Sequence, residues 1–186
     1  MTTLSAPPPR WVALAAAAQS IVTFLVYLQT AYPSISGGDA GELAGVACTG
    51  GVAHPPGYPL WLMLAQACLW AKPHGMDPAR ALNLLSALLS TVAGALLSSA
   101  IRALARGTVQ WPASWYGAAS EKRSGEVSQL QFGTHTTKEL VLLAASCGAG
   151  ALYSFSIGTW EFSGQAEVFA LNNALIAAML RLQVKT

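Results

Sequence analysis

The sequence predicts an all-α, polytopic integral membrane protein, and its composition and charge spacing carry that prediction. Hydrophobic residues make up 53% of the 186 residues and charged residues only 10%, whereas about a quarter of the residues in soluble domains are charged. The mean hydropathy is +0.45. A helix needs about 20 apolar residues to cross the hydrocarbon core of a bilayer. Several charge-free intervals of this chain reach that length.

The first charge-free interval predicts a membrane-spanning helix over 11–32. No charged residue occurs between Arg10 and Asp39. A secretory signal peptide is the alternative, and the alanine-rich stretch near the N-terminus favours it. Because the apolar span is long for a signal peptide and no clear cleavage site follows, we expect an uncleaved helix after a cytosolic segment 1–10.

The next region, 33–78, is expected to be a loop on the far side of the membrane. Within it, the stretch 59–71 is apolar but too short to cross, and prolines precede it. These features predict an interfacial or half-inserted helix over 59–71. Trp61 and Trp70 suit the headgroup layer, where amphipathic rings are favoured.

Two further charge-free intervals predict spanning helices over 79–104 and 139–160. Between them, 105–138 is polar and rich in turn residues, and we expect it to be a mobile cytosolic loop. A short turn at 161–167 then leads into the start of a fourth helix over 168–186, whose apolar part is short for a crossing. The expected architecture is therefore about three full spans, one interfacial helix and one helix cut short.

The distribution of basic residues predicts the orientation, because short cytoplasmic loops collect Lys and Arg. The 105–138 connection holds or borders five basic residues: Arg102, Arg106, Lys122, Arg123 and Lys138. The 33–78 loop holds only Lys72, and Arg80 follows it. We therefore expect the N-terminus and the 105–138 loop to be cytosolic and the 33–78 loop to be luminal or extracellular. The net charge of +2 is too small for a nucleic-acid partner.

The three cysteines do not indicate a redox or zinc site, since no Cys-x-x-Cys pair occurs. A disulfide between Cys48 and Cys68 is possible in an oxidising lumen. Buried free thiols are the expected state.

Asp39 and Glu42 are the first candidate site residues. Gly37 and Gly38 followed by Asp39-x-x-Glu42 fit a capping box, in which Asp39 accepts a backbone N–H and Glu42 reaches back. The spacing alone favours this cap. A carboxylate at a membrane interface is also partly desolvated, and it can then accept a proton in a reaction. The two roles are compatible, and two nearby carboxylates do not by themselves predict a metal site.

His54 precedes Pro55 and Pro56, and proline restricts the residue before it to extended conformations. A rigid turn leading into the next helix is the simpler interpretation. In the functional interpretation, the imidazole contacts a donor phosphate or orients the neighbouring carboxylate.

Glu167 and Asn172 lie where the last helix is expected to begin, on the same side of the membrane as Asp39. A solvated helix start with Glu167 near the positive end of the helix dipole is one interpretation. The other is a second wall of the Asp39 site, with Glu167 or Asn172 facing Asp39, because acidic and amide groups at a membrane boundary are costly without partners.

Three sequence blocks resemble a known family: GDAGEL at 38–43, GVAHPPGYPL at 51–60 and AEVFALNN at 166–173. Together with Arg80 and Asn83 at the start of the second predicted span, they look like the GT-C-type protein O-mannosyltransferases of the endoplasmic reticulum that modify plexin and Met-type receptor domains. The resemblance covers the N-terminal part of that family only.

The resemblance implies a multi-pass membrane enzyme of the endoplasmic reticulum. Its lipid-linked sugar donor would be dolichyl phosphate mannose, its acceptors Ser or Thr hydroxyls of luminal protein domains, and its reaction an inverting displacement. By position, Asp39 becomes the base and Glu42 its catalytic support. The residues implied to bind substrate are His54, Tyr58, Arg80, Glu167 and Asn172. No cofactor and no metal ligand are implied.

A different class of protein fits the same helices. The chain would then be a non-catalytic, truncated membrane protein or a small helical subunit, whose acidic loop serves only to cap helices. The role of Asp39 beyond folding distinguishes the two classes.

Overall fold

The computed structural model describes residues 9–108 and 126–184, and the described residues form helices without strands. There are seven helices in these ranges: α1 (Arg10–Thr30), α2 (Ala40–Thr49), α3 (Pro59–Ala71), α4 (Pro78–Thr108), α5 (Glu126–Ser154), α6 (Ile157–Ser163) and α7 (Phe169–Gln183). Two of them, α1 and the Pro78–Gly107 part of α4, are long and apolar enough to cross a membrane. The prediction of an all-α polytopic membrane protein is confirmed.

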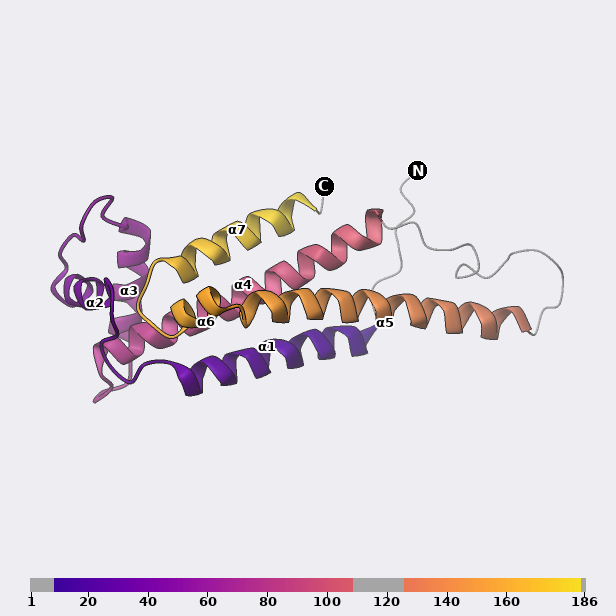
Figure 1. The fold of residues 1–186 in the computed structure, drawn as a ribbon, viewed down its shortest axis with the longest axis horizontal. Helices are drawn as coiled ribbons and strands as arrows, with labels where there is room; N and C mark the ends of the chain where they lie inside the picture. The colour runs from indigo at the N-terminus through magenta and orange to yellow at the C-terminus, as the bar shows by residue number, and fades with distance from the viewer. Residues whose placement is uncertain (1–8, 109–125, 185–186) are drawn as a thin grey trace.

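The long helices lie side by side around α4 (Figure 1). α7 packs along one side of α4, and α1 and α5 pack along the other. The short helices α2 and α3 gather at the end where α1 finishes and α4 begins. This arrangement gives the bundle two chemically distinct ends.

Small residues let α4 and α5 approach closely. A Cβ atom added at Gly94 would lie 2.5 Å from Ser154 Oγ, and one added at Gly150 would collide with Ser98 Oγ. Small side chains at helix crossings are common in membranes, where packing and hydrogen bonds replace the hydrophobic drive between helices. Tyr27 of α1 joins the same crossing, since its hydroxyl donates to the Ser154 carbonyl at 2.6 Å.

The prediction of one continuous helix over 139–160 is wrong. α5 ends at Ser154, and α6 follows at an angle of 66°, so the pair Thr136–Ser154 and Ile157–Ser163 makes a third candidate span only as a broken one. The Ser156 hydroxyl donates to the Tyr153 carbonyl at 2.8 Å. Such local serine bonds compete with the helical ladder.

The polar segment 105–138 also differs from the predicted loop. α4 continues to Thr108 and α5 starts at Glu126, so 126–138 is helical, while 109–125 lies outside the described residues. The stretch 126–138 contains no proline, and polarity indicates exposure to water rather than the absence of a helix. Likewise, α6 extends to Ser163, which shortens the predicted turn 161–167.

The end of the bundle that carries α2 and α3 has its own small core. α2 buries Ala40, Leu43, Ala44 and Ala47, which recur at helical spacing on one face. They pack with Trp61, Leu62 and Ala65 of α3, Leu82 of α4, and Ala166 of the segment before α7. α3 covers the residues of the predicted interfacial helix, and its depth in a membrane stays a prediction. This core fixes the three segments from which the predicted site residues project.

Candidate functional site

Asp39 is the N-cap residue that directly precedes α2, and its carboxylate makes no capping bond. Its side chain is 59% exposed, and its Oδ2 lies 3.8 Å from His54 Nε2. The predicted capping box is therefore wrong in both halves. The Asp39 side chain caps no N–H of α2, and the Glu42 carboxylate bonds to a different segment. A carboxylate without a capping role is available to a substrate.

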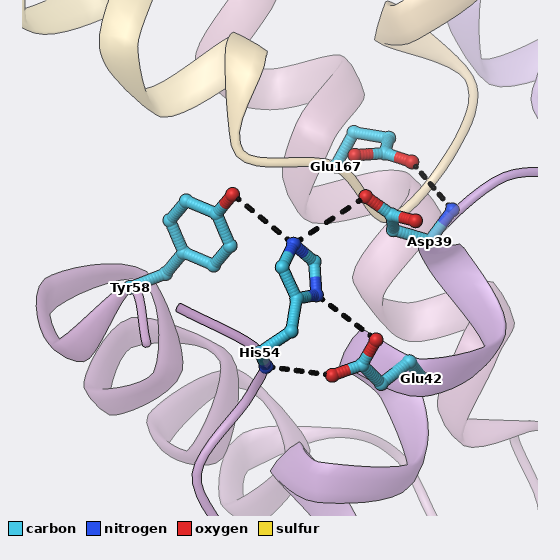
Figure 2. A network of polar contacts seen from close by, with 5 residues as sticks. All are labelled: Asp39, Glu42, His54, Tyr58 and Glu167. Atoms are coloured by element: carbon cyan, nitrogen blue, oxygen red, sulfur yellow. Dashed lines mark hydrogen bonds and ion pairs between the residues drawn. The ribbon is translucent and has the colours of Figure 1, made fainter. Parts of the chain in front are cut away.

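Glu42 holds His54 by two bonds, shown in Figure 2. Its Oε1 accepts the backbone N–H of His54 at 2.7 Å, and its Oε2 lies 2.9 Å from His54 Nδ1. The contact with Glu42 at Nδ1 orients the ring so that its other nitrogen, Nε2, faces Asp39. The bonds from the His54 backbone and then the ring hold the pKa of Glu42 below its usual range, and Glu42 raises the pKa of His54.

Tyr58 contacts the His54 imidazole through both its hydroxyl and its ring. Its hydroxyl lies 3.3 Å from His54 Nε2, and the two rings meet edge to face with centroids 5.4 Å apart. Tyr58 has a φ of 45°, a left-handed conformation that is costly for a residue with a side chain. Strained backbone conformations are frequent at functional sites. Here the strained conformation of Tyr58 lets the chain enter α3 at Pro59 while the Tyr58 ring remains in contact with His54.

Glu167 supplies the bond to α2 that the sequence assigned to Glu42. Its Oε1 accepts the backbone N–H of Asp39 at 3.2 Å, and its own carbonyl accepts the Trp61 indole N–H at 3.2 Å. Glu167 is only 5% exposed. Burial, followed by the negative charge of Asp39, raises its pKa. Gly38 makes room for this contact, with a φ of +65° and a would-be Cβ 3.3 Å from Glu167 Oε1.

Arg80 and Asn83 shape the segment that leads to Asp39. The Arg80 guanidinium donates to the carbonyls of Leu28, Ala31 and Tyr32 at 3.2, 2.6 and 3.0 Å, so it caps the C-terminal end of α1. The Asn83 amide donates to the carbonyls of Tyr32 and Ser34, both at 2.9 Å. These bonds tie the start of α4 to the chain entering the site.

The structure thus brings together five of the predicted site residues, which Figure 2 shows in one network: Asp39, Glu42, His54, Tyr58 and Glu167. It directs Arg80 to backbone carbonyls of α1 and leaves Asn172 exposed at the start of α7. Sequence reasoning left Asn83 and Trp61 out of the site. An amide near the start of the charge-free stretch 81–101 was the available signal for Asn83, whose side chain the structure buries.

The network places an exposed carboxylate and a polarised imidazole on one surface. Within the described residues, no group of three or more His, Cys, Asp or Glu side chains is arranged to hold a metal ion. The chemistry that these groups can carry out is proton transfer and the binding of an anion.

Comparisons with known proteins identify relatives over most of the chain. The family model described as protein O-mannosyl-transferase TMEM260 N-terminal domain matches residues 39–186. The protein O-mannosyl-transferase TMEM260 of Mus musculus is 33% identical over 160 residues, which cover 86% of this chain and 18% of the relative. The Dictyostelium discoideum protein of the same description is 29% identical over 161 residues, covering 86% of this chain and 15% of the relative.

The chain therefore spans about a sixth of the length of these curated relatives. No solved structure matches it.

Proposed function

Since the chain belongs to the family of the protein O-mannosyl-transferase TMEM260 N-terminal domain, we propose that it carries the base and part of the donor site of a membrane mannosyltransferase. The donor in this proposal is dolichyl phosphate mannose, and the acceptors are Ser or Thr hydroxyls of luminal protein domains. The location is the endoplasmic reticulum membrane. The exposed, uncapped carboxylate of Asp39 beside His54 is the observation that carries the proposal.

Asp39 acts as the general base. Its carboxylate takes the proton of the acceptor hydroxyl as the hydroxyl oxygen attacks the anomeric carbon of mannose. The bond between that carbon and the phosphate oxygen breaks, and the lipid phosphate leaves with the electron pair. A single displacement inverts the configuration at the anomeric carbon. The 59% exposure of the Asp39 side chain leaves room for an acceptor.

His54, held by Glu42, stabilises the leaving group. The side-chain hydrogen bond to Glu42 raises the pKa of His54, which shifts the ring toward the imidazolium form. A positive ring at Nε2 is suited to the charge that develops on the departing phosphate. The Tyr58 hydroxyl, 3.3 Å from the same nitrogen, adds a donor or an acceptor on that side. The two bonds from Glu42 keep the ring in place as the charge moves.

Glu167 positions Asp39 rather than reacting. It holds the Asp39 backbone N–H from a buried position. Because burial and Asp39 raise its pKa, Glu167 tends toward the neutral form, which lessens the repulsion between the two carboxyl groups. The base is thereby anchored at its backbone while its side chain stays free.

The distribution of basic residues supports the proposed orientation in the membrane. Arg10, Arg102 and Arg106 lie at the end of the bundle away from Asp39. The positive-inside rule places that end in the cytosol. The Asp39 network then faces the lumen, where the acceptor domains of a secretory-pathway enzyme are found.

The test is mannose transfer from dolichyl phosphate mannose to a plexin-type domain, in microsomes that lack the endogenous transferase and express this chain. Asp39→Asn is expected to lower the rate by about 10²- to 10⁴-fold, the usual contribution of a general base. Asp77→Asn is the matched control. Asp77 is an exposed carboxylate of the same region, and its Oδ1 accepts the Arg80 N–H that begins α4, a bond that asparagine can keep.

Equal loss from both variants, or transfer that persists in Asp39→Asn, contradicts the assignment of the base. Absence of transfer with the unaltered chain is expected both of a part of an enzyme that needs the remainder of the relatives' length and of a non-catalytic membrane subunit. Asp39→Asn is then compared in a full-length relative that carries the same substitution.

A further inference from the structure

A cavity of about 270 Å³ lies between α1, α4 and α5, in the half of the bundle away from Asp39. The surface of the cavity is mostly apolar, with contributions from side chains such as Ala16 and Ala95, and serine and amide side chains such as Ser98 and Gln19 also line it. The side-chain amide of Gln19 already has a hydrogen-bond partner, since it donates to the Cys147 carbonyl at 2.8 Å. The cavity is therefore an apolar slot between helices, and one charged residue, Arg102, is part of its lining.

Arginines outnumber carboxylates next to this slot. Arg102 and Arg106 of α4 both bind the carboxylate of Glu139 on α5. Arg181 of α7 donates from Nε to Ser99 Oγ at 2.7 Å, and Ser99 itself lines the cavity. Two guanidinium groups thus share the Glu139 carboxylate, and the third binds a neutral hydroxyl, among the residues that these contacts join.

The arginines also have unused donors. Arg102 Nε, Arg106 Nε and Arg181 Nη1 are buried without an acceptor in the part of the chain that the structure describes. A buried charged donor without a partner is costly. Guanidinium groups bind phosphate oxygens with more than one N–H, so a phosphate is the group that satisfies both the excess charge and the free donors.

We propose that this place binds an anionic phospholipid, with the phosphate on the arginines and a segment of an acyl chain in the slot. The volume lies just below the range of about 300–1,000 Å³ for pockets that enclose a whole small ligand, which suits part of one chain with the headgroup outside. Basic pockets between membrane helices bind lipid headgroups in this way. The site is separate from the Asp39 network and does not depend on the proposed transferase activity.

The test reconstitutes the chain in nanodiscs of phosphatidylcholine, with or without phosphatidylglycerol as the anionic probe. Native mass spectrometry then counts the lipid retained after detergent extraction. The expected result is selective retention of phosphatidylglycerol. Arg181→Gln should weaken retention about fivefold, the factor given by about 1 kcal/mol for each basic residue near a lipid phosphate. This variant leaves both arginine bonds to Glu139 in place. Its unfolding temperature in phosphatidylcholine alone, compared with that of the unaltered chain, separates weaker lipid binding from the loss of the Arg181 bond to Ser99.

A second variant, Ala16→Leu, fills the slot without changing charge and should also reduce retention. Lys72→Gln is the charge-matched control at the opposite end of the bundle, and it should have no effect. Equal retention of both lipids, or unchanged retention in Arg181→Gln, overturns the proposal. If inorganic phosphate with phosphatidylcholine raises the unfolding temperature as much as phosphatidylglycerol does, and Ala16→Leu is without effect, the site takes a free anion and the lipid assignment is wrong.

Discussion

Two carboxylates of this molecule, at opposite ends of the bundle, are held in opposite ways. The Glu139 side chain is 9% exposed, and two arginines bind its oxygens. The Asp39 side chain is 59% exposed, and its described ionic contact is the 3.8 Å approach to His54. A buried carboxylate whose oxygens are taken serves the fold, while an exposed one with a free oxygen is available to a substrate. The difference supports our proposal that the Glu139 end serves the fold and the Asp39 end the chemistry.

The largest effect on stability should come from removing Glu139. Glu139→Ala leaves two largely buried arginines without their carboxylate, which costs about 3–5 kcal/mol for a broken buried pair. Asp39→Ala should change stability by about 0.5 kcal/mol or less, as for other exposed sites. Unfolding temperature of the purified protein in detergent measures both. A large drop for Asp39→Ala and none for Glu139→Ala would reverse the comparison.

The pH dependence of transfer probes the Asp39 end. The folded pKa of His54 is raised, so the favourable charge on the ring is fully present below the ordinary value of 6.5 and is lost as pH rises through the raised value. Transfer should fall along that alkaline limb. Glu42→Gln removes the first cause of the shift and should move the limb to lower pH. A limb that stays in place in Glu42→Gln means that His54 is not the group that titrates.

Gly38 tests whether the backbone at Asp39 matters. Gly38→Ala forces a side chain into a φ of +65° and against Glu167 Oε1, at a cost of about 1 kcal/mol or more. We expect a several-fold loss of transfer as Asp39 shifts. Gly37→Ala is the matched control, since a Cβ at Gly37 has nothing within 4 Å. Equal rates for the two variants would show that the Glu167 contact does not position the base.

The smallest effect is expected at Tyr58. Tyr58→Phe removes the hydroxyl at 3.3 Å from His54 and keeps the edge-to-face contact of the rings. A typical intramolecular hydrogen bond contributes about 0.5–1.5 kcal/mol, and this contact is long at 3.3 Å, so transfer should fall by roughly tenfold or less. Rates measured at several donor concentrations show whether the loss lies in donor binding. A loss as large as that of Asp39→Asn would make Tyr58 a catalytic group.

The sequence was sufficient for the fold class and for the short apolar helix 59–71, because composition, charge-free length and proline position act locally. It was also sufficient to suggest that Glu167 faces Asp39. It misassigned the cap of α2, since the residue that bonds the Asp39 N–H lies far along the chain. Local spacing carries no information about such a partner.

The break at Ser154 was missed for a related reason. An apolar run shows how far a helix can continue, but it does not show where the helix ends. Here the end of α5 depends on the Ser156 hydroxyl, which donates to the Tyr153 carbonyl, and on the Tyr27 hydroxyl, which donates to the Ser154 carbonyl. Arg80 resembled a substrate ligand in the sequence, and only the packing of α4 against the end of α1 reveals the carbonyls that it binds.

The most direct test measures mannose transfer and unfolding temperature together for Asp39→Asn and Glu139→Gln in the same membranes. Asp39→Asn should lose transfer and keep its unfolding temperature, while Glu139→Gln should lose stability and keep its transfer per folded molecule. Transfer that survives in folded Asp39→Asn protein would contradict the assignment of chemistry to the Asp39 end.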